Sequence, residues 1–442
     1  MQSVRPTETT LCRVESDADF CHHPSMSSLA LTILCVAIAL LVVGWLLDLV
    51  VETLNLKHAD PEIPGEFRDV YDAEKYATSQ RYLRERTRFG LISATVSLVL
   101  TLAFILLGGF GWVDNLVSGW VEGTIPRALL YAGLLVLLSM IVGLPFSIYS
   151  TFVIEEKYGF NKTTPKTFIL DLVKSIGLGV VLGAPVFAAV LWIFMSVPLA
   201  WLWAWIALTL IQLFFMYIGP VVIMPLFNKF EPLEEGELQT EIRNYANEQG
   251  FEVSGIFSVD GSKRSTKANA YFTGFGKTRR IGLFDTLIEN HSVTELVAVL
   301  AHEIGHCKLH HIKKMLVIGI ASTGLMFFIL GLFLRTPALY EAFGVVFAEN
   351  KIYIGMMLFG FLFSPISTLI GLVQIWFTRK HEFEADAFAA TTTGQTQPMI
   401  DALKKLTVDN LGNLTPHPLK VFLEYTHPPV LKRIDALRNL KV

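Results

Sequence analysis

The stretch VAVLAHEIGHCKLHH, residues 297–311, places two histidines four positions apart and a glutamate directly after the first. At 3.6 residues per turn, His302 and His306 lie on one face of a helix, where both imidazoles reach one metal ion. Glu303 then lies beside that ion, in position to accept a proton from water. A chance match would leave only a histidine-rich helix. The stretch predicts the metal-binding helix of a zinc hydrolase.

The sequence just before this motif predicts where the helix begins. Ser292 and Glu295 have the spacing of a capping box, in which each side chain bonds to the backbone of the other. From there the stretch LVAVLAHEIGHCKLHH reads as helix up to His311. We therefore expect one uninterrupted helix through the motif.

A catalytic zinc needs a third protein ligand and an open fourth position. The local pattern with a glycine and a third histidine after the motif is excluded, because Leu309 and Ile312 occupy those positions. His310 and His311 are interpreted as helix-end histidines near the membrane surface. The third ligand must therefore come from elsewhere in the chain.

The candidate is the stretch FTRKHEFEADAFAA, residues 377–390. In a helix, Glu382 and Asp386 lie on one face and Glu384 on the opposite side, where we expect no part in metal binding. Glu382 then serves as a metal ligand, and Asp386 orients a ligand histidine from behind. Alone, this stretch would be a solvated acidic face; together with the distant histidine motif it predicts a completed site.

Composition places this site in a membrane protein. The chain has 442 residues, of which 52% are hydrophobic and 17% charged, and its mean hydropathy is +0.50. A net charge of −3 with scattered basic residues gives no electrostatic footprint for nucleic acid. Apolar segments long enough to span a bilayer are residues 29–50, 89–113, 128–154, 172–195, 198–224, 315–334 and 353–377. The first follows an acidic tail and is too long for a signal peptide, so it is read as a retained span.

Basic residues orient these spans. The connection from 51 to 88 holds seven lysines and arginines, whereas residues 111–126 hold none. By the positive-inside rule, the N-terminus lies outside, and the histidine motif and the C-terminus lie on the cytoplasmic side. Four cysteines are present, and only Cys12 and Cys21 share the outer tail, where a disulfide is conceivable.

The predicted spans divide the chain into five parts. These are an N-terminal tail (1–26), five transmembrane helices with their loops (27–226), a first catalytic part (227–314), two transmembrane helices (315–377) and a second catalytic part (378–442). A catalytic unit built from both soluble parts is discontinuous in sequence.

The chain resembles a known family, the integral-membrane CAAX prenyl endopeptidases, which are zinc metalloproteases with seven transmembrane helices. The resemblance rests on these blocks: EEKYGFNKTTPKTFILDLVK, MPLFNKFEPLEEGEL, DGSKRSTKANAYFTGFGKTRRIGLFDTL, LAHEIGHCKLHH, RKHEFEADAFA and EYTHPP. It implies an α-helical integral membrane protein whose helices form a hollow barrel, with a zincin-type catalytic domain that contains a small β-sheet.

The resemblance also implies roles for individual residues. It makes Glu382 the third zinc ligand, and it makes Asn269, Ala270 and Tyr271 part of an edge strand, residues 269–274, that pairs with the substrate backbone. His427 in THPP would lie near the scissile carbonyl, and Arg433 would support that corner. Without the resemblance, these would be an ordinary strand and turn.

One departure from the family pattern concerns Lys267, which stands where many relatives have a histidine. The first 25 or so residues match nothing in the family, and Met26 is a possible alternative start.

The expected function is zinc-dependent hydrolysis of peptide bonds, with one Zn²⁺ per chain and a peptide or protein substrate, prenylated or not. The alternatives are a heat-shock-type membrane quality-control protease, which usually has fewer spans, and a transporter, which would place ionisable residues in mid-membrane. The expected location is a bilayer with the catalytic side cytoplasmic. That bilayer would be the endoplasmic reticulum or nuclear membrane of a eukaryotic cell, or the inner membrane of a bacterium.

Overall fold

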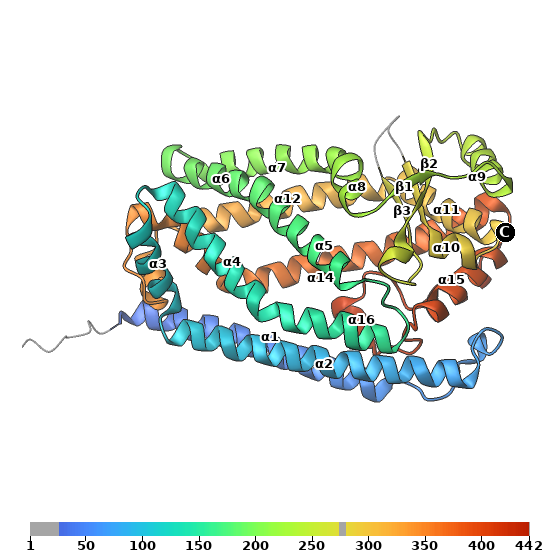
Figure 1. The fold of residues 1–442 in the computed structure, drawn as a ribbon, viewed down its shortest axis with the longest axis horizontal. Helices are drawn as coiled ribbons and strands as arrows, with labels where there is room; N and C mark the ends of the chain where they lie inside the picture. Colours follow the sequence, from blue (N-terminus) through green and yellow to red (C-terminus); the bar gives the residue numbers. More distant parts are fainter. Residues whose placement is uncertain (1–25, 274–279, 442) are drawn as a thin grey trace, which may run out of the picture.

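The computed structural model describes residues 26–273 and 280–441. Within them, seven helices are long and apolar enough to cross a membrane, as predicted. Figure 1 shows them running along the long axis of the molecule. In order they are α1 (Ser28–His58), α2 (Ala73–Leu106), α4 with η2 (Thr124–Tyr149 and Ser150–Glu155), α5 with η3 and α6 (Pro165–Leu178, Gly179–Gly183 and Ala184–Ser196), α7 with η4 and α8 (Ala200–Ile218, Gly219–Ile223 and Met224–Phe227), α12 (His311–Phe333) and α14 (Ile352–Thr393).

The predicted end of the second span is wrong. The apolar run continues to Val113, but α2 ends at Leu106 and a separate short helix, α3 (Gly109–Trp120), follows. The turn between them passes through Gly108, whose φ of 71° lies in the left-handed region that favours glycine. A hydropathy window cannot see this turn, because its neighbours are all apolar.

The seven helices form a closed ring. Contacts run from α1 to α2, from α2 to η2 at the end of α4, and from α4 through α6, α7, α12 and α14 back to α1. At most 17% of the most apolar window of any of these helices is buried within the molecule. Most of each span's apolar surface is thus left outside the packed interior of the molecule. The predicted barrel is confirmed.

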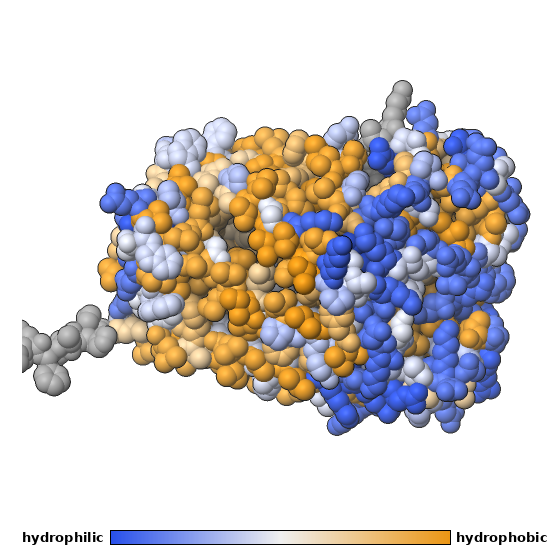
Figure 2. All heavy atoms as spheres, in the orientation of Figure 1, coloured by the Kyte–Doolittle hydropathy of each residue, from blue (hydrophilic) through white to orange (hydrophobic). Residues whose placement is uncertain are grey.

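The surface divides into two zones along the long axis. Figure 2 shows an apolar belt over the transmembrane helices and a hydrophilic end that holds the sheet and the C-terminal helices. Large apolar side chains of the spans and the turns between them, such as Leu107, Val136 and Leu210, are exposed. Their exposure is expected where lipid is the solvent.

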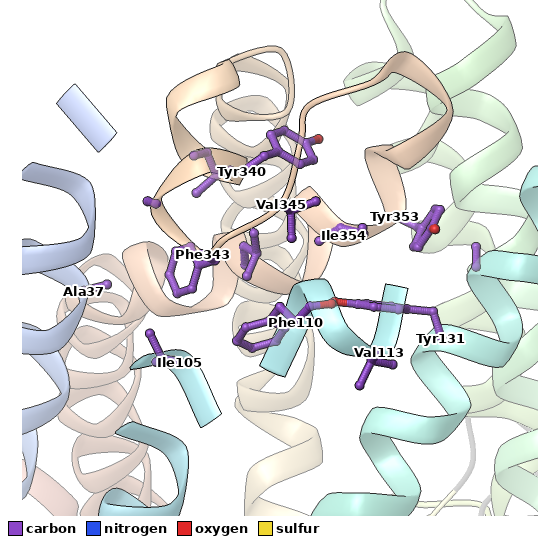
Figure 3. Close-up of a cluster of buried hydrophobic side chains, with 14 of the residues drawn as sticks. Ala37, Ile105, Phe110, Val113, Tyr131, Tyr340, Phe343, Val345, Tyr353 and Ile354 are labelled. Atoms are coloured by element: carbon purple, nitrogen blue, oxygen red, sulfur yellow. The ribbon is translucent and has the colours of Figure 1, made fainter. Parts of the chain in front are cut away.

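The end of the ring far from the sheet is closed by packed aromatic side chains. Figure 3 shows Phe110, Tyr131, Tyr340, Phe343 and Tyr353 in one cluster built from α3, α4, α13 (Pro337–Ala342) and α14. Phe110 packs edge-on against Phe343, and Tyr131 against Tyr353, at centroid distances of 5.7 and 5.3 Å. Next to these rings the buried carboxylate of Asp114 accepts a 2.6 Å hydrogen bond from Tyr353 Oη and pairs with the Lys351 ammonium at 2.7 Å. Both contacts link α3 to the start of α14.

The hydrophilic end contains a four-stranded sheet in the order β1-β2-β4-β3. The strands are β1 (Phe230–Pro232), β2 (Gly255–Val259), β3 (Ala270–Thr273) and β4 (Arg280–Phe284). β2 and β4 are parallel, whereas β1 and β3 are antiparallel to their neighbours. β3 is therefore an edge strand, as the resemblance implied.

The remaining helices of the hydrophilic end pack around the sheet, α11 and α14. α9 (Glu237–Glu248) and α15 (Gln397–Asp409) contact α11 (Val293–Lys308), α10 (Asp285–Asn290) contacts β4, and α16 (Pro418–Glu424) and α17 (Val430–Arg438) contact α14. The short helices are η1 (Gly65–Phe67), η5 (Gly261–Lys263) and η7 (Glu349–Lys351), of which η7 precedes α14. α11 buries Leu296, Leu300 and Ile304, spaced four apart, in one core with the sheet. Its opposite face is left for the histidines.

Candidate metal centre

The helix that carries the motif begins as predicted and ends early. Both hydrogen bonds of the capping box between Ser292 and Glu295 are present. However, α11 ends at Lys308, and His310 adopts a left-handed φ of 61° before His311 opens α12. The expected uninterrupted helix is wrong here, because no glycine or proline marks the turn. Its consequence is that His311 points back toward the motif.

The third ligand reaches the motif on a long helix. α14 has 42 residues, which corresponds to about 60 Å, twice the thickness of the hydrocarbon core. It therefore crosses the ring and continues into the hydrophilic end, where it packs on α11. The predicted boundaries at 314/315 and 377/378 both fall inside continuous helices.

Gly305 allows α11 and α14 to approach closely. A Cβ built on this glycine would lie 3.1 Å from Phe388 and 3.3 Å from the Cα of Ala385. Both contacts are tighter than ordinary van der Waals distances. The glycine between the two histidines thus lets the helix that bears Glu382 lie directly against them.

Three ligand atoms converge at this contact. His302 Nε2 lies 3.1 Å from His306 Nε2. The Glu382 carboxylate lies 3.3 Å from His306 Nε2 and 3.6 Å from His302 Nε2. His302 and Glu382 are buried, and His306 is partly buried. The structure thus brings together the three side chains that the sequence predicted as ligands.

Hydrogen bonds to the Nδ1 atoms of His302 and His306 leave their Nε2 atoms free to bind a metal. His302 Nδ1 lies 2.8 Å from Asp386, which can only accept, so this nitrogen carries the proton. His306 Nδ1 lies 3.0 Å from His311 Nδ1. With both Nδ1 atoms engaged, each Nε2 lone pair faces Glu382 and is available to a metal.

The geometry fits zinc. Ligand atoms bound at about 2.0–2.2 Å to one tetrahedral ion lie about 3.3–3.6 Å apart, close to the separations found here. In addition, Oε2 of Glu382 is buried without a hydrogen bond, and the Arg433 guanidinium lies 3.2 Å from it. A buried carboxylate oxygen is stabilised by such a cation, and a zinc ion would be a second one.

Asp386 and Arg433 form a buried pair behind the ligands. The Arg433 guanidinium donates to both oxygens of Asp386, at 2.7 and 2.6 Å, and also approaches Glu382 to 3.2 Å. Burial opposes the charged form of Arg433, but the hydrogen bonds with Asp386 outweigh it and raise the pKa of the guanidinium. Both predicted supporting residues are therefore in contact with the site.

A second group of possible ligands, His311, His381 and Glu384, lies behind His306. The rings of His311 and His381 are stacked, 4.0 Å apart and 11° from parallel. Lone pairs in the planes of parallel rings do not converge on one ion. Instead, His311 Nε2 lies 2.9 Å from Glu384, so the arrangement is a hydrogen-bonded chain from His306 through His311 to Glu384.

Sequence reasoning missed this chain. Glu384 was expected to play no part, and it does lie away from Glu382, but the unforeseen turn at His310 brings His311 within its reach. The only signal in the sequence was the repeated histidine after the motif.

Glu303 and His427 face a cavity of about 380 Å³ beside the ligand set, which Val299 and Met399 also line. Burial raises the pKa of Glu303 above the ordinary value for a glutamate, and the nearby histidines offset only part of that effect. His427 is exposed, and its Nε2 lies 3.7 Å from Glu382. The chemistry available here is proton transfer and hydrogen bonding next to a metal.

The edge strand begins at the same cavity. Asn269 and Ala270 line it, but the Tyr271 ring lies near Phe284, at a centroid distance of 6.1 Å, and is not among the lining residues. Asn269 O accepts from Phe284 N at 3.1 Å. By alternation the backbone N–H of Ala270 faces the open edge, where it bonds to the Asn269 side chain at 2.9 Å. The predicted residue Gly274 lies outside the described residues.

Lys267, at the position that departs from the family pattern, ties β3 to the membrane helices. Its ammonium lies 2.7 Å from Glu155 and 3.0 Å from Tyr82 Oη, and it sits over the Phe160 ring at 4.3 Å. The Lys267 ammonium thus has its partners on the membrane helices and takes no part in the group of His302, His306 and Glu382.

Comparisons with known proteins agree with this architecture. A family model described as "CAAX prenyl protease N-terminal, five membrane helices" matches residues 52–229, and one described as "Peptidase family M48" matches residues 232–441. The chain is 37% identical over 406 residues to CAAX prenyl protease 1 of Saccharomyces cerevisiae, covering 86% of this chain and 89% of that protein. It is 32% identical over 424 residues to CAAX prenyl protease 1 homolog of Homo sapiens, with coverage of 86% and 89%. The crystal structure of S. mikatae Ste24p matches with a TM-score of 0.86 at 36% identity, covering 93% of this chain and 99% of that one.

Proposed function

We propose that His302, His306 and Glu382 hold one zinc ion per chain. On the matches above, the chain belongs to the CAAX prenyl proteases of peptidase family M48 and is a multi-pass membrane metalloendopeptidase. The observation that supports the proposed zinc site most is the convergence of both Nε2 atoms on the Glu382 carboxylate, at 3.3 and 3.6 Å. Zinc in such a site supplies a Lewis acid that polarises the scissile carbonyl and makes water a stronger acid.

Glu303 acts as the proton carrier. Its raised pKa suits a base that must take a proton from the attacking water and then release it to the leaving amine. His427, which lines the same cavity, donates a hydrogen bond to the carbonyl oxygen as negative charge develops there. Both residues line one cavity, so the two roles are exercised on the same peptide bond.

The substrate lies along β3 as an added strand. The start of β3 borders the cavity, and the edge N–H of Ala270 is paired only with the neighbouring Asn269 side chain. An extended peptide replaces that bond by a backbone hydrogen bond. This geometry requires an extended segment around the cleaved bond, and it supports Asn269 and Ala270, but not the Tyr271 side chain, as substrate contacts.

The substrate class is a C-terminal CAAX-type peptide that carries a prenyl group, delivered from the bilayer to the cytoplasmic side. The relatives' printed names support it, since they are CAAX prenyl proteases, and the site lies at one end of the ring of apolar helices. A heat-shock-type protease with fewer spans is disfavoured by the match to the N-terminal membrane region.

The test compares cleavage of a farnesylated CAAX peptide with cleavage of the same peptide unprenylated, using purified full-length protein. We expect a higher kcat/KM for the farnesylated peptide. Equal rates for both peptides would contradict the prenyl preference while leaving the peptidase assignment intact. The Glu303→Gln protein, run in parallel, measures any contaminating activity.

A further inference from the structure

A cavity of about 710 Å³ lies where α2 meets the turn after α4, apart from the metal centre. One half of its wall is basic, from Arg81, Arg84, Arg88 and Lys157, with Glu85 among them. The other half is apolar or aromatic, and its lining includes Phe89, Ile92, Tyr149 and Ile154. We call this the basic cavity.

The basic cavity keeps an excess of positive charge. Glu85 is engaged by Lys157, whose ammonium lies 2.7 Å away, and by Tyr158 Oη, also at 2.7 Å. By contrast, the three arginines form no ion pair with any residue that the structure describes. Three guanidinium groups on successive turns of one helix are thus available to an anion.

The position of the cavity on α2 points to lipid. Farther along the helix, Ile92, Val96 and Val99 form an exposed apolar stripe, with exposed fractions of 57%, 36% and 58%. Ser93 and Ser97 lie off this stripe, about 100° and 140° around the helix from Ile92. The apolar stripe therefore faces the bilayer. Arg88 lies one turn before Ile92 on the same stripe, so the cavity opens where the bilayer-facing wall turns from apolar to charged.

We propose that the basic cavity binds the headgroup of an anionic phospholipid. The arginines would hold the phosphate groups, and the aromatic and aliphatic wall would contact the start of the acyl chains. A basic pocket at the membrane border has the chemistry to recognise such headgroups, because both the charge and the apolar surface are matched. A free anion would leave the apolar half of the wall unused.

The experiment uses full-length protein in a zwitterionic or nonionic detergent. Phosphatidylinositol 4-phosphate, phosphatidylserine and phosphatidylcholine are titrated separately, and bound lipid per protein is measured by native mass spectrometry. We expect both anionic lipids to bind more tightly than phosphatidylcholine. Arg84→Gln with Arg88→Gln should weaken anionic binding by about fivefold per arginine.

The matched control is Arg86→Gln. Arg86 lies on the same helix but does not line the cavity, and its guanidinium sits 6.0 Å from the centre of the Tyr82 ring. This variant should bind anionic lipid as the unmodified protein does. The double variant Arg84→Lys with Arg88→Lys keeps the charge and should retain most of the binding. Peptide cleavage by each variant verifies that the fold is intact.

Two results would overturn the proposal. One is unchanged lipid binding by the double glutamine variant, which would show that the cavity is not the site. The other is equally tight binding of inositol 1,4-bisphosphate, a headgroup without acyl chains, which would show a site for a soluble anion instead of a lipid.

Discussion

At the residue scale, a Glu303 variant tests proton transfer separately from metal binding. It faces the cavity but contributes no atom to the ligand set. Glu303→Gln should therefore keep bound zinc and lower kcat by at least about a hundredfold, because an amide has nearly the same shape but cannot accept the proton. Zinc per protein and peptide cleavage are measured on the same preparation. Loss of zinc together with activity would assign Glu303 to metal binding instead.

The second residue-scale prediction ranks three carboxylates of α14. Glu382→Ala should remove zinc and activity together, since it deletes a ligand. Asp386→Ala, which frees His302 Nδ1 and Arg433, should cost about 10- to 100-fold in zinc affinity or activity. Glu384→Ala should cost less, about tenfold at most, because it acts on His306 only through His311.

The outcome for Glu384 distinguishes the sequence-based expectation from the structural one. Helical phase alone predicts no effect of Glu384→Ala. The hydrogen-bonded chain predicts a measurable loss, shared by His311→Ala and not increased further in the double variant. A zinc-loaded, fully active Glu384→Ala protein would show that the chain does not support His306, and a zinc-loaded, active Glu382→Ala protein would refute the ligand assignment.

At the element scale, the close contact between α11 and α14 determines how near Glu382 lies to the two histidines. Gly305→Ala introduces a Cβ 3.1 Å from Phe388 and 3.3 Å from Ala385, so one helix must shift by a few tenths of an ångström. Because Glu382 is on α14, the shift separates it from the histidines, and we expect at least about tenfold weaker zinc binding or activity. Metal affinity is measured by competition with a chelator.

The control for this variant is Gly319→Ala in α12. A Cβ at Gly319 meets no atom within 4 Å, and alanine favours a helix more than glycine does. It should leave zinc binding unchanged. If both variants behave alike, the effect at Gly305 is not a matter of packing.

Elements were predictable from the sequence where one local signal dominates. Apolar length gave seven spans, and the capping box located the start of α11. Two turns were not predicted. One lies at Gly108 within an apolar run, and the other at His310, where a non-glycine residue adopts positive φ. The first has a local signal, the Gly108-Gly109 pair, which a hydropathy window does not register, whereas the second has no glycine or proline to mark it. The ligand trio was foreseeable because each of its parts has a fixed spacing, whereas the contact of His311 with Glu384 depended on an unmarked turn.

At the scale of the whole molecule, the number of spans determines which connections lie at the same end of the ring. Ser27, at the start of α1, donates to Glu341 of α13 through its backbone N–H and its hydroxyl, both at 2.6 Å. The N-terminal end of the first span therefore lies at the aromatic end of the ring. Seven crossings then place the C-terminus with the sheet and the metal centre at the opposite, hydrophilic end, as Figure 1 shows.

Charge decides which end faces the cytoplasm. The lysine- and arginine-rich connections at residues 51–88 and 156–166 follow the first and third spans, at the hydrophilic end, and the positive-inside rule predicts that this end is cytoplasmic. Single cysteines test this in a variant that lacks the natural ones. Glu122→Cys, between the second and third spans, should react with a membrane-impermeant maleimide added from outside, and Lys162→Cys, between the third and fourth, should react only after permeabilisation. Both positions are exposed, so access is limited by the membrane alone. Labelling of both from one side would contradict the ring as a membrane-spanning unit, and the reverse pattern would place the metal centre outside the cytoplasm.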